Sequence, residues 1–524
     1  MNRNQTISFL KTPMPASYPS PPKVVASAGE QRSYAAALPC LRPDSSRGEG
    51  FGQASRVAAL TLGSLVLLAG CAVGPNYNRP AVAAPTGWKE AVVVTNAPVL
   101  PTAWWKIFND AELDALEAQA VAANQDLKRA VARLTEARAI ARVSKADLYP
   151  SLTAGGAYSR SRQSENRDNV APKLESDDFS SSFDLNYELD VWGRVRRNVE
   201  VSKADAAAAA TDLEVVLLTL TADVARNFQT LRSLDNEKSV IEATIALRLD
   251  AVRLQETRNQ AGLINEVDVT RARTELANVE AELHAITRSR ALVEHALAVL
   301  CGQAPADFAV AAKATNIVPP EIPAGLPSEL LQRRPDIVAA EHNLKAANAR
   351  IGVAKAAFFP TIKLTGAAGL ASADLGTFVE APSRIWSLGP SVHLPIFEGG
   401  RNRANLKVAE ARYEQNVATY RSSVLNAFRD VEDSLSDLST LTAQAEAVSR
   451  ALASARDTAT LANERYQKGL TSYLDVVDAQ RAALQAERQD TQLRGQRAVS
   501  TILLAKALGG GWQRPNAGGL ATAD

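Results

Sequence analysis

The chain repeats one unit twice, and this repetition limits its fold more than any other feature of its 524 residues. The segment Arg258–Leu263 recurs as Arg465–Leu470, whose residue numbers are 207 higher. Upstream, Asp126–Pro150 corresponds to Asp336–Pro360 at an offset of 210. Because the spacing holds over about 170 residues, a duplicated structural unit is predicted. Further pairs at the offset of 207 are Asp268 and Asp475, Ala272 and Ala479, Glu280 and Glu487, Leu297 and Leu504, and Gly302 and Gly509.

Each copy is predicted to fold as a helix, two strands, a long helix and a shorter helix. The first helices cover about 110–146 and 327–357, and prolines follow them at Pro150 and Pro360. Apolar residues then alternate, most clearly from Phe179 to Leu189, so one face of that strand is apolar. The predicted strands are 152–158 and 179–189 in the first copy, and 361–372 and 384–396 in the second.

The segments 194–260 and 401–467 contain no proline and are predicted to be uninterrupted helices of about 100 Å. Apolar residues follow three- and four-residue spacings from Leu213 to Val252 and at matching places of the second segment, which is the heptad pattern of a coiled coil. Gly262 and Gly469 are expected to end these helices, because glycine readily adopts the left-handed conformation found there.

The first 70 residues have the character of an export signal with a long extension. Val57–Ala69 is apolar but only about 13 residues long, which is too short to span a membrane. Small residues then precede Cys71, as in the processing site that bacterial lipoproteins carry, so acylation of Cys71 is predicted, and Ala72 after it favours the outer membrane. A secretory signal followed by an unrelated cysteine is the alternative. We expect translation to start shortly before Val57.

The charge balance argues against a nucleic-acid protein, which needs a concentrated basic surface. The chain has 58 Lys and Arg against 57 Asp and Glu, and residues 1–70 contain 7 and 3 of these, so the remainder has 51 against 54. The three cysteines and four histidines form no CxxC or HxxxH spacing. Phosphate-loop and nucleophile motifs are also absent from the sequence, so we expect no enzyme activity, no cofactor and no metal.

Four strands per chain cannot form a closed barrel in a membrane, where an open edge leaves backbone groups without hydrogen bonds. Three chains would supply twelve strands, and the strand segments have the ~10-residue length of a tilted membrane strand. We therefore predict a trimer that shares one barrel, with the helices forming a second tube. A small soluble sheet that caps a coiled-coil adaptor is the alternative, because alternating strands are a weak membrane signal.

Several segments resemble the TolC/OprM family of outer-membrane efflux proteins, in its lipoprotein branch. The matching stretches are Trp104–Phe108, Leu331–Ile337, Tyr473–Arg481 and Lys506–Trp512, and the run Arg333–Asp336 followed by Ala340-Glu341 and Ile351-Gly352 is the most specific. The resemblance covers Cys71 to Trp512. It implies a mainly α-helical chain that forms a trimer, with a twelve-stranded barrel in the outer membrane of a Gram-negative bacterium and an α-helical coiled-coil barrel in the periplasm.

The resemblance also implies the function. The trimer would be the passive exit duct of a tripartite pump for small toxic molecules, joined through a periplasmic adaptor protein to an inner-membrane transporter of the resistance-nodulation-division (RND) class. The exported compounds cannot be named from the sequence. A periplasmic or surface coiled-coil scaffold lipoprotein without a pore is the alternative function.

The chain is predicted to divide into six parts. They are the extension and signal peptide at 1–70, a lipid-anchored segment at 71–109, the first repeat at 110–302, a linker at 303–326, the second repeat at 327–511 and a tail at 512–524.

The turn between the last two helices holds the candidate gate. Asp475, Asp478 and Arg481 are spaced i, i+3 and i+6, so they share one helix face, and Leu474 lies beside them. The resemblance implies that matching residues constrict the periplasmic entrance, where threefold symmetry would turn each residue into a ring. Three carboxylates in one ring attract cations. The family has a basic residue where this chain has Thr471, so the contacts that stabilise the closed state are an open question.

These residues also have structural interpretations. Ser472 and Asp475 have the spacing of a helix capping box. The resemblance implies that Gly262 and Gly469 contact the adaptor protein, whereas their role as helix C-caps is sufficient to explain them. Cys301, at an apolar helix end, is interpreted as a small core residue.

Overall fold

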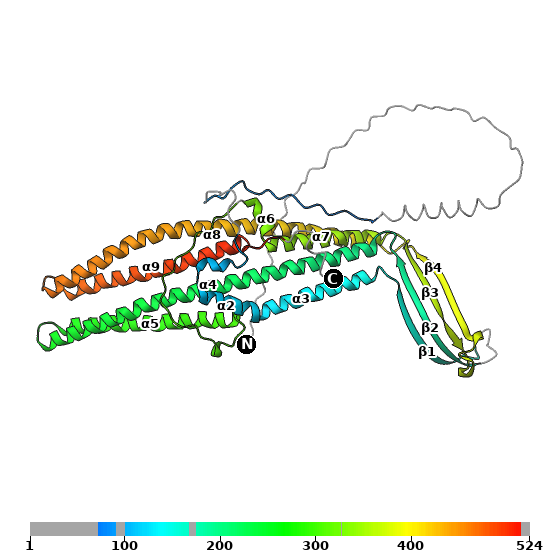
Figure 1. The fold of residues 1–524 in the computed structure, drawn as a ribbon, viewed down its shortest axis with the longest axis horizontal. Coiled ribbons are helices and arrows are strands. Elements are labelled where there is room, and N and C mark those ends of the chain that lie inside the picture. Colours follow the sequence, from blue (N-terminus) through cyan, green and yellow to red (C-terminus); the bar gives the residue numbers. More distant parts are fainter. Residues whose placement is uncertain (1–71, 91–99, 167–173, 326, 515–524) are drawn as a thin grey trace, which may run out of the picture. The chain divides into compact units, whose positions relative to one another are not determined.

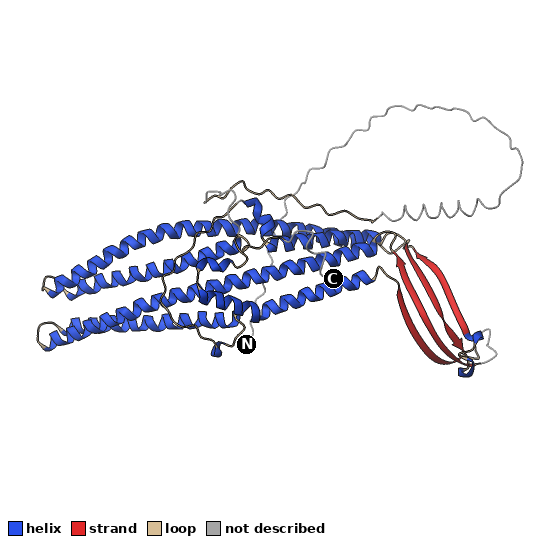
Figure 2. Ribbon diagram, viewed as in Figure 1, coloured by secondary structure: helices blue, strands red, loops and turns tan. Residues whose placement is uncertain are grey.

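The computed structural model describes residues 72–90, 100–166, 174–325 and 327–514, and within this part the duplicated unit is confirmed (Figures 1 and 2). A 3₁₀ helix, Trp104–Phe108, precedes the first copy. The first copy consists of α2 (Ala111–Ala123), α3 (Gln125–Ala146), β1 (Ser151–Arg162), β2 (Glu175–Leu189), α4 (Arg194–Gln260) and α5 (Glu266–Leu300). The second consists of α6 (Leu330–Arg333), α7 (Pro335–Ala356), β3 (Thr361–Ser372), β4 (Arg384–His393), α8 (Arg401–Gln467) and α9 (Tyr473–Ala507).

The first helix of each copy is broken, whereas one continuous helix was predicted. Asn124 separates α2 from α3: its side chain caps α3 through Leu127 N, and its amide group donates to Leu300 O at 3.0 Å. In the second copy Pro335 starts α7, since its fixed φ suits the first turn of a helix. The C-terminal end of α5 packs against the break at Asn124, and that of α9 packs against the break at Arg334. Hydrophobic periodicity carries no information on these tertiary contacts.

Two glycines make these end-to-end contacts possible. Gly302 follows α5 with φ +69°, and a Cβ there would lie 2.6 Å from the carbonyl oxygen of Ala123. Gly509 follows α9 with φ +94°, and a Cβ there would lie 2.1 Å from the carbonyl oxygen of Arg333. The backbone needs the left-handed conformation and has no room for a side chain, so the repeated glycines fix how the shorter helices dock.

The long helices have the predicted bounds, and each begins after a glycine of positive φ, Gly193 or Gly400. α5 returns along α4 and α9 returns along α8, so each copy ends in a helical hairpin (Figure 1). α9 also packs against α4, which joins the two hairpins. The predicted seam residues of both long helices are buried or partly buried, so the coiled-coil pattern is confirmed.

The four strands form one antiparallel sheet in the order β1-β2-β3-β4 (Figure 2). β4 ends at His393 rather than near residue 396, because Pro395 has no N–H to pair. The register separates the side chains by polarity, except at the end of β1 and the start of β2, where Arg160, Arg162, Glu175 and Asp177 share the apolar face. One face carries Leu152, Ala154, Tyr158, Phe179, Phe183, Leu185, Leu364, Leu370, Trp386 and Leu388. The other carries Thr153, Ser159, Asp178, Ser180, Ser182, Asp184, Lys363, Thr365, Ser387 and Ser391.

Apolar cores lie where the helices meet. One contains Trp104, which is 1% exposed, together with residues of α2, α4 and α5. A second contains residues of α7, α8 and α9 and is joined by Trp88 from the N-terminal segment. Within the described ranges, none of the helices combines the length and the apolar character that crossing a membrane requires.

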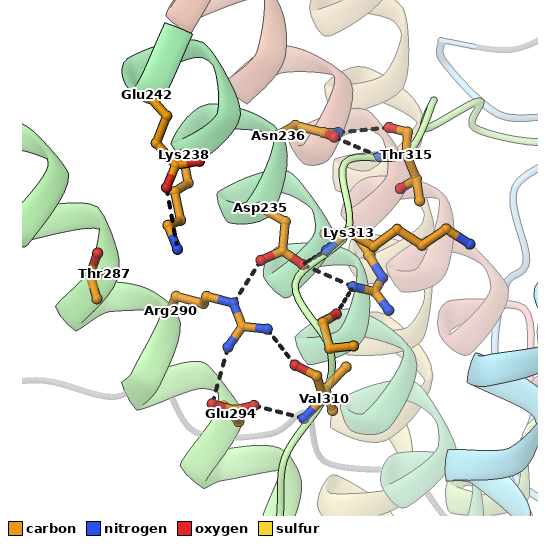
Figure 3. A network of polar contacts seen from close by, with 12 residues as sticks. Asp235, Asn236, Lys238, Glu242, Thr287, Arg290, Glu294, Val310, Lys313 and Thr315 are labelled. Atoms are coloured by element: carbon orange, nitrogen blue, oxygen red, sulfur yellow. Dashed lines mark hydrogen bonds and ion pairs between the residues drawn. The ribbon is translucent and has the colours of Figure 1, made fainter. Parts of the chain in front are cut away.

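The predicted linker is fixed to the first hairpin by buried polar contacts, which Figure 3 shows. Asp235 of α4 accepts from Arg290 Nε at 2.6 Å, from Arg232 Nη1 at 2.8 Å and from the backbone N–H of Lys313 at 3.2 Å. Asn236 exchanges two hydrogen bonds of 2.8 Å with the backbone of Thr315. The linker therefore covers one side of α4.

The segment 72–90 has no regular secondary structure and lies along α4 and α7. Val73 N–H donates to Trp192 O at 3.0 Å, beside the sheet, and Asn348 of α7 donates to Pro75 O at 3.0 Å. Further along, Trp88 Nε1 donates to Gly325 O at 2.8 Å. The start of the described chain is thus held near the sheet end of the helices.

Candidate functional site

The hairpin turns are built by two glycines of positive φ, Gly262 (+70°) and Gly469 (+73°). In both turns nothing lies within 4 Å of the place where a Cβ would be, so only the backbone conformation requires glycine. Each glycine is followed by an exposed leucine, Leu263 at 74% and Leu470 at 65%. The predicted C-cap role of the glycines is confirmed, and the turns present similar apolar tips.

Asp475 acts as a helix cap. Its Oδ2 accepts from Ser472 N–H at 3.0 Å and from Ser472 Oγ at 2.9 Å, and the Thr471 hydroxyl donates to the same oxygen. These bonds, that of Thr471 first, hold the pKa of the Asp475 carboxyl below its usual value. The predicted capping box of Ser472 and Asp475 at the start of α9 is therefore confirmed, and the Thr471 hydroxyl adds a hydrogen bond to its carboxylate.

The other three predicted gate residues are exposed but do not act alike. The residue Leu474 is 42% exposed, and the side chain of Asp478 is 61% exposed. Asp478 lies 3.6 Å from Arg481, whose guanidinium mainly contacts Glu275 of α5, with Nε donating to Oε2 at 2.9 Å and Nη2 donating to Oε1. The structure thus brings Asp478 and Arg481 together, while Asp475 is occupied by its own turn.

Arg481 connects the two hairpins through a buried carboxylate. The Glu275 side chain is only 6% exposed, and Arg248 of α4 lies 3.9 Å from it. The hydrogen bond from Arg481 lowers the pKa of Glu275, whereas burial lowers the pKa of Arg248. Sequence reasoning missed Glu275 and placed Arg248 only in the coiled-coil seam, because no local pattern pairs residues about two hundred positions apart.

Apolar and aromatic contacts accompany these charges near the turns. Tyr473, Val476 and Val477 of α9 form a small core with Val252 of α4 and Ala272 of α5. Tyr466 of α8 packs against this core, and its hydroxyl donates to Gln255 of α4 at 2.9 Å. A cavity of about 480 Å³ between α5 and α9 is lined by Leu474 and Arg481, among others. The region therefore holds the two hairpins together at the end opposite the sheet.

The remaining residues singled out in the sequence are structural or undescribed. Cys301 is fully buried at the end of α5, and burial raises the pKa of its thiol to about 11. Burial lowers the pKa of His342 to about 4. Over the described ranges, no group of three or more His, Cys, Asp and Glu side chains is placed to hold a metal ion. Cys71, the predicted lipidation site, lies outside the described residues.

Comparison with known proteins decides the family. The family model described as "Outer membrane efflux protein" matches residues 116–303 and 326–510, one match for each copy. The chain belongs to this family. It is 35% identical over 481 residues to the outer membrane protein OprJ of Pseudomonas aeruginosa, a match that covers 89% of the chain and 97% of OprJ. It is 33% identical over 448 residues to the cation efflux system protein CusC of Escherichia coli K12, a match that covers 85% of this chain and 97% of CusC.

Solved structures of the family have the same fold. The outer-membrane channel OprN superimposes with a TM-score of 0.79 at 31% identity, covering 84% of this chain and all of OprN. The predicted recognition, function and location are confirmed: the chain is an efflux channel protein of the outer membrane, extending into the periplasm. The family is one of channels rather than enzymes. The scaffold alternative is disfavoured.

Proposed function

We propose that three copies of this chain form one passive duct, with a shared twelve-stranded barrel above an α-helical barrel. The sheet supports this, because in the described chain β1 and β4 each have one edge without a partner strand. Its apolar face carries exposed side chains such as Trp386 (82%) and Leu388 (67%). Such a sheet satisfies its backbone in lipid only by closing with other copies, with its apolar face outward.

Within this duct, Asp478 and Leu474 are the residues that restrict the periplasmic entrance. Asp478 has a free carboxylate oxygen and an exposed side chain, whereas Asp475 is engaged by Ser472 and Thr471. Threefold symmetry would place three Asp478 carboxylates around one axis, a ring that favours cations over anions. Arg481 would fix the position of this ring relative to α5.

The partners are a periplasmic adaptor protein at the hairpin tips and, through it, an RND-type transporter of the inner membrane. The exposed leucines beside Gly262 and Gly469 are apolar surfaces suited to such an adaptor. The lipid anchor would be at Cys71. Two residues later, the Val73 N–H donates to Trp192 O beside the sheet, which supports an anchor at the membrane end of the chain. The duct needs no catalysis, and it leaves the choice among small molecules to its partners.

Single-channel recording in planar bilayers tests this function. Purified full-length protein is expected to conduct ions as a trimer, and Asp478→Ala should raise the conductance or weaken block by divalent cations about tenfold, since the ring loses its charge. Asp126→Ala, which removes an exposed aspartate of α3, is the control. Equal conductance and block in wild type and Asp478→Ala would refute the assignment of the ring.

A further inference from the structure

A second polar contact between the hairpins lies deeper than the candidate gate. It centres on Arg488 of α9, seven residues beyond Arg481 and therefore about 10 Å further from the turn. Arg488 Nη1 donates to Glu282 of α5 at 2.9 Å, and its Nε and Nη2 donate to Glu237 of α4 at 2.9 and 2.7 Å. We propose that Arg488 and Glu237 form the principal latch that keeps the hairpins together and the entrance closed.

The shallower contact has a second cation in the closed state. Without Arg481, Glu275 would still have Arg248, which belongs to the first hairpin and lies 3.9 Å away. A buried carboxylate that keeps a cation nearby avoids most of the desolvation cost. Removing Arg481 should therefore destabilise the closed state only weakly.

The deeper contact has no such replacement. Glu237 is 4% exposed, and its donors are Arg488 and Gln492, the latter at 3.1 Å. Both donors belong to α9, so they leave together when this helix moves. Among the described residues none from the first hairpin donates to Glu237. In the closed state without Arg488, Glu237 would be a buried carboxylate whose remaining donor is the amide of Gln492, and an unpaired buried charge is among the costlier single defects in a protein.

Packing around the latch is open, which increases the share of the polar contact in holding α9. A cavity of about 650 Å³ is lined by Arg488, a second of about 570 Å³ is lined by Glu237, and Gln492 lines both. The apolar cluster at this level consists of Ile241, Val279 and Ile286 with their neighbours, and only Leu484 joins it from α9. At this level, unlike at the core around Tyr473, α9 shares little apolar surface with the first hairpin, so the ion pair supplies most of the contact.

The inference rests on the proposed function, because it assumes that the entrance widens when the hairpins separate. A direct measurement of the distance between the hairpins tests the latch separately from the duct. Spin labels at the exposed tips, in a Leu263→Cys/Leu470→Cys background of the full chain, report tip distances by double electron–electron resonance. Arg488→Gln should raise the ratio of separated to closed tips at least about tenfold, equivalent to about 1.4 kcal/mol. Arg488→Lys, which keeps the charge, should remain within about threefold of wild type.

Two further variants serve as controls. Arg481→Gln should change the ratio by no more than about threefold, because Arg248 compensates. Arg456→Gln, which removes an exposed arginine of α8 that pairs with Glu487 of α9 inside the second hairpin, should change nothing. Unchanged tip distances in Arg488→Gln would overturn the latch. Separated tips without any conductance in bilayers would leave the latch standing and overturn the duct.

Discussion

Glu117 of α2 is expected to make the stability of the protein depend on pH. It is fully buried, and neither of its carboxylate oxygens has a hydrogen-bond partner among the described residues. Burial, with a smaller contribution from Asp114, raises its pKa from 4.5 to about 9. The protein thus keeps a neutral carboxylic acid beneath α2 at physiological pH.

The sign and size of the effect follow from proton linkage. The folded chain retains this proton up to about pH 9, whereas the unfolded chain releases it above pH 4.5, so stability falls as pH rises between these values. At pH 8, which is 3.5 pH units above 4.5, the free energy of unfolding is lower than below pH 4.5 by ~1.4 kcal/mol per unit, or about 5 kcal/mol. Glu117→Gln, which is neutral and nearly isosteric, removes this loss.

Thermal unfolding followed by circular dichroism in detergent checks the prediction. Wild type and Glu117→Gln should unfold at similar temperatures near pH 5 and diverge by several degrees toward pH 8, with the variant more stable. Glu136→Gln, which changes an exposed glutamate of α3, should follow wild type throughout. Parallel curves for wild type and Glu117→Gln would show that Glu117 is ionised in the folded protein and would refute the reasoning.

Two other predictions concern packing. Trp104→Ala should lower the free energy of unfolding by about 3–5 kcal/mol, because it empties the centre of the first core, and denaturant unfolding measures this loss; a loss below about 1 kcal/mol would contradict it. Gly352→Leu should displace the segment 72–90, because a Cβ at Gly352 already lies 3.0 Å from the carbonyl oxygen of Val73. Faster tryptic cleavage at Arg79 than in wild type is the expected readout, and an equal rate would argue against this contact.

The most specific part of the family resemblance, the Arg-Arg-Pro-Asp run with Ala340-Glu341 and Ile351-Gly352, consists of residues that stabilise the fold. Glu341, 4% exposed, binds Arg79 of the N-terminal segment at 3.5 Å, Lys345 at 3.1 Å and Arg514 near the C-terminus at 3.2 Å. Gly352 gives the same segment room to approach α7. These residues hold both described ends of the chain on one helix.

The Arg-Arg-Pro-Asp run has a similar role. Arg334 contacts Asp336 at 2.7 Å and Asp430 of α8 at 3.2 Å, and it donates to the last carbonyl of α9, Ala507 O, at 3.1 Å. Pro335 then starts α7. The motif therefore fixes the junction of α7, α8 and α9.

Much of the fold could be predicted because it depends on patterns of neighbouring residues in the sequence. The bounds of α4 and α8 follow from proline-free segments that begin after Gly193 and Gly400 and end before Gly262 and Gly469. The strands follow from two-residue alternation. The break at Asn124 could not be predicted, because it depends on where the end of α5 docks. The break at Arg334 has a local signal, because Pro335 disfavours a helical conformation at the residue before it.

The candidate site divides in the same way. The sequence by itself determined the positions of the turns, the capping role of Asp475 and the shared face of Asp478 and Arg481, since each depends on residues within two helical turns. Only the tertiary structure decided that Arg481 and Arg488 contact carboxylates of the other hairpin. Those partners are brought together by packing between two copies of the unit. Electrostatic energy depends on distance and burial in space, and spacing along the chain reports neither.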